Sequence, residues 1–313
     1  MTDPTPVPAR RVGGQGIGLV FSISAYGVWG FLPGFFLLLA PASPWEIVAF
    51  RILMSLVFCA ILLTVTRGWR AFLELARQPR VLGAMALAGV LIYINWQVFV
   101  LATLGGHVVE GSLGYFINPV ITVALGVVLL RERLRPLQWV AVGVSVIAIL
   151  VIALGYGAFP WIALALALSF GFYGFIKKRV GGQVDAVSGL TLETVWLTPV
   201  AIVQLVVTGV TVGLTFGTVS PVHTLLMVAT GVITATPLLL FAAAARRLPL
   251  VALGLTQYLA PILQFLTGVF LLNEPMPLGR WIGFALVWLS LVLLTVDMVR
   301  AARASRRASV PVA

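Results

Sequence analysis

Residues 111–133, GSLGYFINPVITVALGVVLLRER, have a counterpart in residues 253–275, LGLTQYLAPILQFLTGVFLLNEP. Each stretch contains a long apolar run with a proline in its interior, and a glutamate lies next to the last residue of the stretch. A shift of 142 positions places Pro119 on Pro261. Chance similarity between apolar segments is common, so one matched pair carries little weight. The pattern predicts an internal repeat that the rest of the chain can test.

Further matches extend this repeat over most of the chain. The matched pairs are Gly89 with Gly231, Gly126 with Gly268, Glu132 with Glu274, Trp139 with Trp281 and, at a shift of 144, Gly27-Val28-Trp29-Gly30-Phe31 with Gly171-Phe172-Tyr173-Gly174-Phe175. Matches in several separate segments are hard to obtain by accident. We therefore expect two homologous halves.

The composition places the chain in a membrane. Of its 313 residues 61% are hydrophobic and 9% are charged, whereas a soluble domain carries roughly 25% charged residues. Apolar runs of roughly twenty residues, the length that crosses ~30 Å of hydrocarbon, recur along the chain. The first run, from Ile17 to Ala40, is too long for a signal peptide and is expected to remain as a helix.

These runs predict an all-α integral membrane protein with ten transmembrane helices. The expected helices cover residues 16–40, 44–66, 80–103, 107–130, 136–155, 159–177, 186–208, 221–245, 248–272 and 278–299. The connections between them are short, so we expect one compact bundle without a soluble domain.

The basic residues alternate between the connections. Of the 20 Lys and Arg residues, 18 lie before the first predicted helix, after the tenth, or in every second connection. Because cytoplasmic loops carry an excess of Lys and Arg, this pattern predicts that both termini lie in the cytoplasm. The net charge of +11 could suggest nucleic-acid binding, but that function needs a basic cluster on a soluble surface, and we expect no nucleic-acid partner.

The charges also indicate that the two halves are inverted. The turn Arg131-Glu132-Arg133-Leu134-Arg135 is basic, whereas its partner Asn273-Glu274-Pro275-Met276-Pro277 has no arginine. Each half holds five helices, and an odd number of crossings turns the second half upside down, as in many secondary transporters. The expected organisation is a cytoplasmic tail (1–15), a first repeat (16–156), a second repeat (157–299) and a basic cytoplasmic tail (300–313).

Matched interruptions of inverted repeats point to a transport site near the middle of the membrane. Pro119 and Pro261 form such a pair, because a proline frees a backbone carbonyl and kinks a helix. Small and polar residues share one helical face near each proline: Glu110, Gly114, Asn118 and Thr122 in one helix, and Gly254, Gln257, Tyr258 and Gln264 in the other. Such residues also pack helices together, so packing and cavity lining stay open for each residue, although the two helices together favour a cavity.

Aromatic and amide side chains of several helices are expected to line this cavity. The candidate substrate-binding residues are Tyr26, Trp29, Asn95, Trp96, Gln97, Tyr115, Asn118, Tyr173, Trp196, Gln257 and Tyr258. Aromatic rings beside amides would suit an amphipathic or weakly cationic organic solute, although an aromatic stripe is more often ordinary packing.

Three ionisable residues inside predicted helices stand out, Arg51, Glu110 and Glu193, because each would cost about 2.5–3.5 kcal/mol if unpaired at the bilayer centre. Arg51 and Glu110 lie at similar depths below the outer membrane surface, so we predict an ion pair near the outer gate. Glu193 is the repeat partner of Arg51. It either couples transport to protons or bonds to the backbone or to Trp196, and the second role is favoured. Together with Pro119 and Pro261, these residues are candidates for gating or coupling.

No metal or other cofactor is expected. Cys59 is the single cysteine, which excludes an internal disulfide and a cysteine-based metal site. His107 and His223 lie near the outer ends of helices and are not spaced as metal ligands. Glu132 and Glu274 lie at helix ends and are interpreted as structural.

Several strings resemble the RarD branch of the EamA family, in the drug/metabolite transporter superfamily. They are Glu110-Gly111-Ser112-Leu113-Gly114-Tyr115-Phe116-Ile117-Asn118-Pro119, Gln138-Trp139, Leu192-Glu193-Thr194, Trp196-Leu197-Thr198-Pro199, Thr236-Pro237-Leu238-Leu239, Gln257-Tyr258 with Pro261, and Glu274-Pro275. The resemblance covers residues 16 to 300 and implies two EamA repeats, a bacterial inner-membrane location and a small-molecule permease that works by alternating access. Two features depart from the branch: Phe50-Arg51 replaces a common His-Arg, and Leu101 to Gly106 lacks an asparagine often found there.

The leading functional prediction is a secondary active transporter for a small organic metabolite or drug-like solute. The alternative is a membrane-embedded enzyme that acts on a lipid-linked substrate, but such an enzyme needs converging nucleophiles, bases or metal ligands, and the sequence offers no such cluster. A receptor would leave the inverted repeat unexplained. The absence of a Walker motif argues against ATP as the direct energy source. The expected partners are the lipid bilayer and the solute, and a homodimer is compatible with the sequence.

Overall fold

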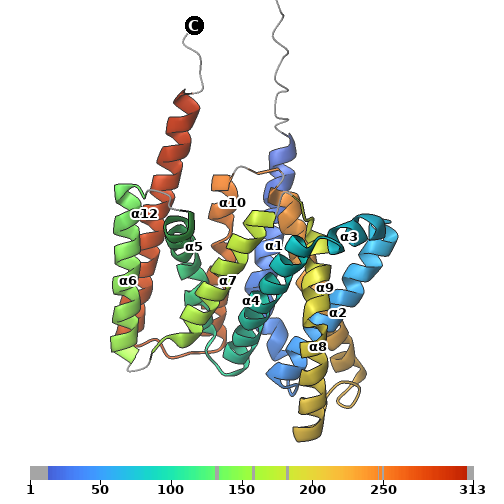
Figure 1. The fold of residues 1–313 in the computed structure, drawn as a ribbon. Helices are drawn as coiled ribbons and strands as arrows, with labels where there is room; N and C mark the ends of the chain where they lie inside the picture. The colour runs from blue at the N-terminus through green and yellow to red at the C-terminus, as the bar shows by residue number, and fades with distance from the viewer. Residues whose placement is uncertain are drawn as a thin grey trace, which may run out of the picture.

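The computed structural model describes residues 13–130, 134–156, 159–180, 183–245, 247–248 and 250–308. These residues form a helical bundle that contains no β-strand (Figure 1). The tails at residues 1–12 and 309–313 and the turn at Arg131, Glu132 and Arg133 lie outside the described residues.

The first half of the chain forms six helices. They are α1 (Gly13–Leu37), α2 (Pro44–Val65), α3 (Trp69–Ala76), α4 (Pro79–Leu104), α5 (Val108–Leu130) and α6 (Pro136–Tyr156). The second half forms α7 (Trp161–Val180), α8 (Ala186–Thr211), α9 (Pro221–Ala245), α10 (Leu250–Thr256), α11 (Leu259–Leu266), the short π-helix η1 (Thr267–Leu271) and α12 (Leu278–Ala308). The predicted helices agree with these bounds to within a few residues, except where the ninth is divided into α10, α11 and η1 and where the tenth continues to Ala308.

The length and composition of these helices identify a multi-pass membrane protein. Seven described helices are long and apolar enough to cross a membrane, and shorter apolar helices cover residues 136–152, 161–177 and 259–271. Large hydrophobic side chains are exposed on the outer surface of α8, where water-facing residues would be polar. Examples are Val203, Val206 and Val210.

Local sequence signals explain where several helices begin. Proline occupies the first position of α2, α4, α6 and α9, where the missing N–H costs no helical hydrogen bond. The Ser43 hydroxyl caps α2 by accepting from the Glu46 amide, at 3.2 Å. Asp185 caps α8 through two backbone amides, each at 3.0 Å.

Helix α3 lies in a predicted connection and was not expected from the sequence. This helix is only eight residues long, too short to register as a transmembrane run. Phe72 is buried against the bundle, whereas Arg70 on the same helix is exposed. The Trp69 indole N–H donates to the Thr64 hydroxyl at 2.9 Å and fixes α3 to the end of α2.

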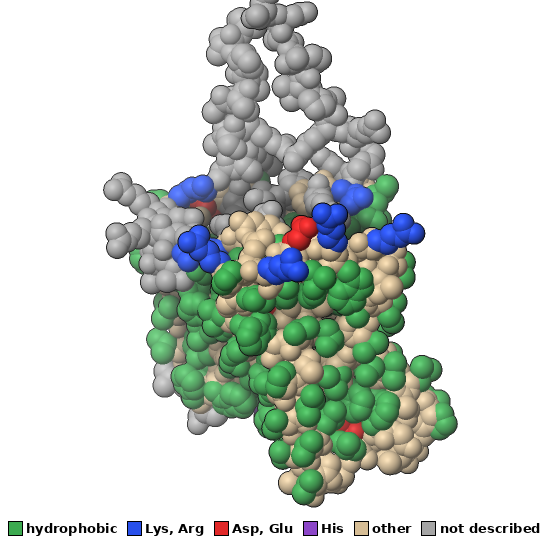
Figure 2. Space-filling view, turned by 45° about the vertical axis from the view of Figure 1, so that its right-hand side comes forward, with side chains coloured by type: hydrophobic (Ala, Val, Ile, Leu, Met, Phe, Trp, Pro, Cys, Tyr) green, Lys and Arg blue, Asp and Glu red, His purple; other side chains and the backbone are tan. Residues whose placement is uncertain are grey.

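The two ends of the bundle differ in charge. We call the end where α1 begins and α12 ends the basic end, and the end where α2, α5, α7, α9 and α12 begin the far end. Figure 2 shows Lys and Arg side chains gathered in a band at the basic end, above a surface that is mostly hydrophobic. This asymmetry is the one that the charge pattern of the sequence predicted.

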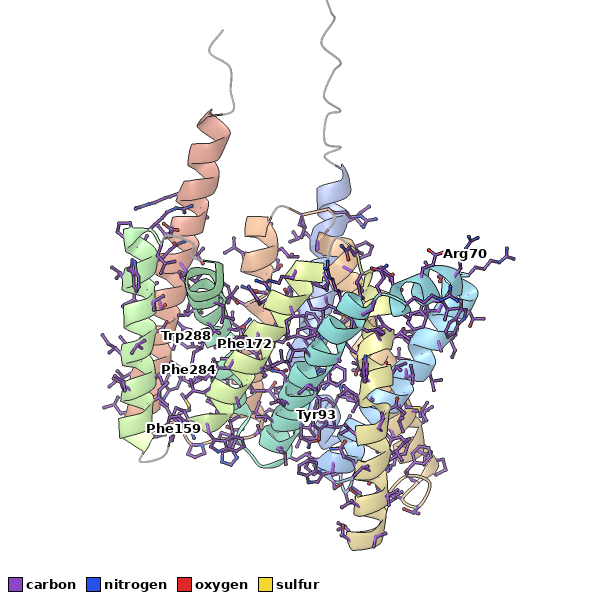
Figure 3. The ribbon with its side chains drawn as sticks, viewed as in Figure 1. Arg70, Tyr93, Phe159, Phe172, Phe284 and Trp288 are labelled. Atoms are coloured by element: carbon purple, nitrogen blue, oxygen red, sulfur yellow. The ribbon has the colours of Figure 1, made fainter. Side chains whose placement is uncertain are left out.

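Two large apolar clusters hold the bundle together. One joins α1, α2, α4, α8 and α9 and includes Phe36 and Met85. The other joins α5, α6, α7, α11 and α12 around Phe116, Phe284 and Trp288, the last two labelled in Figure 3. Burial of such aromatic rings contributes a large share of the packing energy.

Candidate functional site

The helix break between α10 and α11 lies where the sequence analysis placed one half of the transport site. α10 ends at Thr256 and α11 begins at Leu259, so Gln257 and Tyr258 form the break. Pro261 follows in the first turn of α11, and it has no N–H to donate to the Gln257 carbonyl four residues earlier. The break therefore has a local cause in the sequence.

Pro119 does not produce the matching interruption that the sequence analysis expected. α5 continues through Pro119 from Val108 to Leu130. Pro119 removes only the helical bond to the Tyr115 carbonyl, and the Thr122 hydroxyl donates to the Asn118 carbonyl at 3.0 Å. The two prolines thus occupy matched positions, but only the second lies beside a helix break in the described residues.

Asn95 joins three helices rather than facing an open cavity. Its amide nitrogen donates to the Leu166 carbonyl and to the Ser169 hydroxyl, both at 3.1 Å. Its amide oxygen accepts from the Tyr115 hydroxyl at 2.9 Å. These bonds connect α4, α5 and α7 within the apolar core, so packing, one of the two roles left open, accounts for Asn95.

Other predicted amides also connect helices. The Gln204 side-chain nitrogen donates to Gln97 Oε1 and to the Tyr93 hydroxyl, both at 2.9 Å, and links α8 to α4. The Gln264 nitrogen donates to the Trp29 carbonyl at 3.0 Å and links α11 to α1. Some amide atoms keep no partner, among them Gln97 Nε2 and Gln264 Oε1, which are buried.

The polar face of α5 lies against α7. A methyl group placed on Gly114 would lie 2.7 Å from the Ala163 carbonyl oxygen, so the two helices touch there. The Asn118 side chain lies beside Gly171, and its buried oxygen has no hydrogen-bond partner. This face therefore packs helices together, which is the role that competed with cavity lining.

The predicted aromatic residues fall into separate groups. Tyr26 and Trp29 contact each other and Phe241, with ring centroids 5.3 to 6.1 Å apart. Tyr115 contacts Phe99 and Phe170. Trp196 belongs to neither group. It is 49% exposed and lies on the outside of α8. We therefore remove Trp196 from the candidate cavity.

The predicted ion pair between Arg51 and Glu110 is wrong. Arg51 Nε donates to the Thr234 hydroxyl at 2.9 Å, and the guanidinium lies over the ring faces of Trp96 and Phe36. Glu110 instead accepts from the Ile162 amide at 3.1 Å, at the beginning of α7. The prediction failed because similar depth in the membrane does not place two side chains on facing sides of their helices.

Glu193 has a partner that the sequence analysis did not name. Lys177 Nζ lies 2.8 Å from Glu193 Oε1, and the Tyr173 hydroxyl donates to the other carboxylate oxygen at 3.3 Å. The Glu193 side chain is 1% exposed and the Lys177 side chain 29% exposed. The expected backbone or Trp196 contact is replaced by an ion pair between α7 and α8.

Two carboxylates at the far end bind backbone amides across the two halves. Glu274 accepts from the Val108 and Val109 amides at 2.6 and 2.9 Å, at the beginning of α5. Glu46 accepts from the Thr215 and Phe216 amides at 2.9 Å each. Burial raises the pKa of the Glu274 carboxyl, and the two amide donors act in the opposite direction. A structural role was expected for Glu274, but the sequence did not show which amides it binds.

A small cavity of about 130 Å³ lies at the far end. Its lining includes His107, Glu110, Phe159 (labelled in Figure 3) and Arg280. Of the predicted site residues, this cavity contains Glu110. No group of three or more His, Cys, Asp or Glu side chains in the described residues could hold a metal ion.

Comparison with known proteins gives a consistent result. The profile of the EamA-like transporter family matches residues 16–154. "Protein RarD" of Streptomyces exfoliatus is 47% identical over 292 residues, covering 93% of this chain and 92% of the relative. "Protein RarD" of Escherichia coli K12 is 36% identical and covers 90% and 95%. "Chloramphenicol-sensitive protein RarD" of Pseudomonas aeruginosa is 32% identical and covers 95% and 99%.

The fold also resembles a solved structure. One crystal structure aligns with a TM-score of 0.57 at 19% sequence identity, over 91% of this chain and 98% of that chain. At this identity the likeness concerns the fold alone.

Proposed function

The chain belongs to the RarD branch of the EamA-like transporter family, and from this membership we propose that it is a secondary active transporter. It moves a small organic metabolite or drug-like solute across the bacterial inner membrane by alternating access. Its ten membrane crossings are α1, α2, α4, α5, α6, α7, α8, α9, the divided helix α10–α11–η1, and α12.

The observation that carries this proposal is the symmetry of the helix contacts. α5 packs on α7, and the repeat partners of these helices, α11 and α1, pack on each other. The pair α4–α7 corresponds to α9–α1, and α2–α9 corresponds to α8–α4. The pairs α2–α8 and α6–α12 each correspond to themselves. A two-fold exchange of the halves explains all of these pairs, which supports an inverted repeat of residues 16–156 and 157–299.

A pair of matched glycines supports the same correspondence between helices. Gly89 of α4 packs against the backbone of Glu193 in α8. Its repeat partner Gly231 of α9 packs against the backbone of Met54 in α2. Each glycine therefore brings the third helix of one half against the second helix of the other half.

The basic end faces the cytoplasm in this proposal. Its Lys and Arg residues include Arg70, Arg80, Arg135 and Lys177, and an excess of such residues marks cytoplasmic loops. The far end, with Glu46 and Glu274, then faces outward. In this arrangement the contacts between the halves at the far end close the outer side.

A labelling experiment tests the inverted architecture. In a Cys59→Ser background, single cysteines at Arg133→Cys and Met276→Cys are labelled in intact cells with a membrane-impermeant maleimide. We expect Met276→Cys to be labelled from outside and Arg133→Cys only after permeabilisation. Labelling of both cysteines from the same side would contradict the proposal.

A reconstitution experiment tests transport itself. The purified protein in liposomes is offered labelled amino acids, choline-like cations and chloramphenicol, with and without a proton gradient. We expect saturable flux of at least one solute. Pro261→Ala should slow that flux, because the restored N–H favours a continuous helix through Gln257 and Tyr258, and Pro119→Ala in the unbroken helix α5 is the matched control. Absence of flux together with turnover of a lipid would favour an enzyme.

A further inference from the structure

Arg51 is a buried cation that has no carboxylate partner. The residue is 4% exposed, it donates one hydrogen bond to Thr234, and its buried Nη1 has no hydrogen-bond partner. In the part of the chain that the structure describes, no carboxylate oxygen lies within 4.0 Å of its guanidinium. An unpaired charge at membrane depth is expensive, so its presence calls for an explanation.

The acids that could have neutralised Arg51 bind other groups. Glu110 accepts from the Ile162 amide, and Glu193 is paired with Lys177. Glu46, one helical turn and a half earlier on α2, accepts from the amides of Thr215 and Phe216. These three acids therefore have partners elsewhere, and the Arg51 guanidinium is left without an anion.

Aromatic faces hold the guanidinium plane in place. Its central carbon lies 4.3 Å from the ring centroid of Trp96 and 5.4 Å from that of Phe36. Nε is occupied by Thr234, and stacking on ring faces leaves the edge of the guanidinium that carries the unpartnered Nη1 available for a planar anion. Arg51 and the residues that contact it thus come from α1, α2, α4 and α9, which belong to both halves.

We infer that Arg51 binds the carboxylate of the transported solute, and that the substrate is therefore a small organic anion with an apolar body. The inference rests on the proposed function, since a ligand reaches this position only when the helices around it separate. An arginine fork matches the two oxygens of a carboxylate, and the surrounding rings suit an apolar body. This assignment replaces the weakly cationic solute that the aromatic and amide residues suggested.

A binding assay tests the sign of the ligand charge. The purified protein in detergent is titrated with benzoate, phenylacetate and lactate, each beside its uncharged amide, and with 2-phenylethylamine. We expect at least one carboxylate to raise the melting temperature and to give a calorimetric binding signal, while its amide gives neither. Binding of 2-phenylethylamine alone, or of no carboxylate, would overturn the inference.

Variants test whether Arg51 is the residue that binds the carboxylate. Arg51→Gln should weaken binding roughly 100-fold, the expected loss for two charge-assisted hydrogen bonds. Arg51→Lys should keep part of the affinity, because it retains the charge without the fork. Arg70→Gln, on exposed α3, is the control and should bind as the parent does. Equal binding by Arg51→Gln would overturn the inference, provided that this variant elutes as a monodisperse protein.

Three further results separate the explanations. If chloride or phosphate alone reproduces the full stabilisation, the site binds inorganic anions and the inference is wrong. If a carboxylate binds but no flux occurs in liposomes, the proposed function fails while the anion site stands. If a neutral or cationic solute is transported equally well by Arg51→Gln, transport stands and the anion site fails.

Discussion

Arg51 and Glu193 occupy matched positions in the two halves, 142 residues apart, yet their surroundings differ. Glu193 forms an ion pair with Lys177 and accepts from the Tyr173 hydroxyl. Arg51 has a neutral hydroxyl and two ring faces. One buried charge is thus neutralised within the protein, and the other is not.

The difference arises in the helix that supplies the counter-ion, not at Arg51 or Glu193. Lys177 belongs to α7, and the shift of 144 that aligns the beginnings of the two halves places it on Pro33 of α1. The first half therefore has no ionisable residue where the second half has its counter-ion. The comparison teaches that one architecture can hold a structural charge in one half and a free charge in the other.

Loss of Lys177 should produce the largest effect. Lys177→Met leaves the Glu193 carboxylate buried without its counter-ion, which should lower the free energy of unfolding by about 3 kcal/mol, the low end for a broken buried pair, because Lys177 is partly exposed. Unfolding in detergent would measure it. The double variant Lys177→Met with Glu193→Gln should recover most of the loss. A double variant as unstable as the single one would refute a structural pair.

Loss of Glu274 should have the next largest effect. Glu274→Ala leaves the Val108 and Val109 amides without acceptors, and we expect a loss of about 2 kcal/mol in the free energy of unfolding. The exposed Glu74→Ala on α3 is the matched control and should change stability little. Equal stabilities of the two variants would show that water replaces the carboxylate at the far end.

A transplanted counter-ion should sharpen the comparison. Pro33→Glu places an acid at the position in α1 that matches Lys177, and from the correspondence of the two halves we expect it to pair with Arg51. We expect carboxylate binding to weaken about tenfold, equivalent to ~1.4 kcal/mol, in calorimetric titrations. Pro33→Gln separates the effect of charge from that of removing the proline. If both variants bind alike, the comparison of the two facing helices is wrong.

Loss of Arg51 should have the smallest effect on stability. Arg51→Met removes an unpaired buried cation, and replacement by an apolar side chain of similar length should leave the free energy of unfolding within about 1 kcal/mol or raise it. The same unfolding assay provides a direct comparison with Lys177→Met. A loss as large as that of Lys177→Met would show that Arg51 is structural after all.

Most of the fold could be read from the sequence because apolar length and charge alternation are one-dimensional signals. The bounds of α2, α5 and α9 were predicted almost to the residue. α3 escaped because eight residues carry no membrane-length signal, whereas Pro261 indicated an interruption of the ninth helix but not the bounds of α10, α11 and η1. Hydrophobicity reports that a segment lies in the membrane but not whether its backbone is continuous.

The candidate site was harder to predict because it depends on which helix faces which. Asn95 and Gln97 were recognised as polar residues in the membrane, but their partners lie in other helices, 20 to 74 residues away for Asn95 and 107 residues away for Gln97. The Arg51–Glu110 prediction used depth alone and failed for that reason. The sequence alone shows that a shift of 144 places Lys177 on Pro33. The first half therefore lacks the basic residue that pairs with Glu193 in the second half, and this difference could have shown that the two matched charges have different surroundings.

The bonds of Glu46 and Glu274 have a consequence for biogenesis. Glu46 binds amides 169 and 170 residues later, and Val108 and Val109 bind a carboxylate more than 160 residues later. While the second half is still being synthesised, the first half therefore exposes an unsatisfied carboxylate and two unsatisfied amides at the far end. A chain truncated before Glu274 keeps those two amides without their acceptor, so an unfinished protein differs from a complete one in the backbone groups that it exposes at the far end.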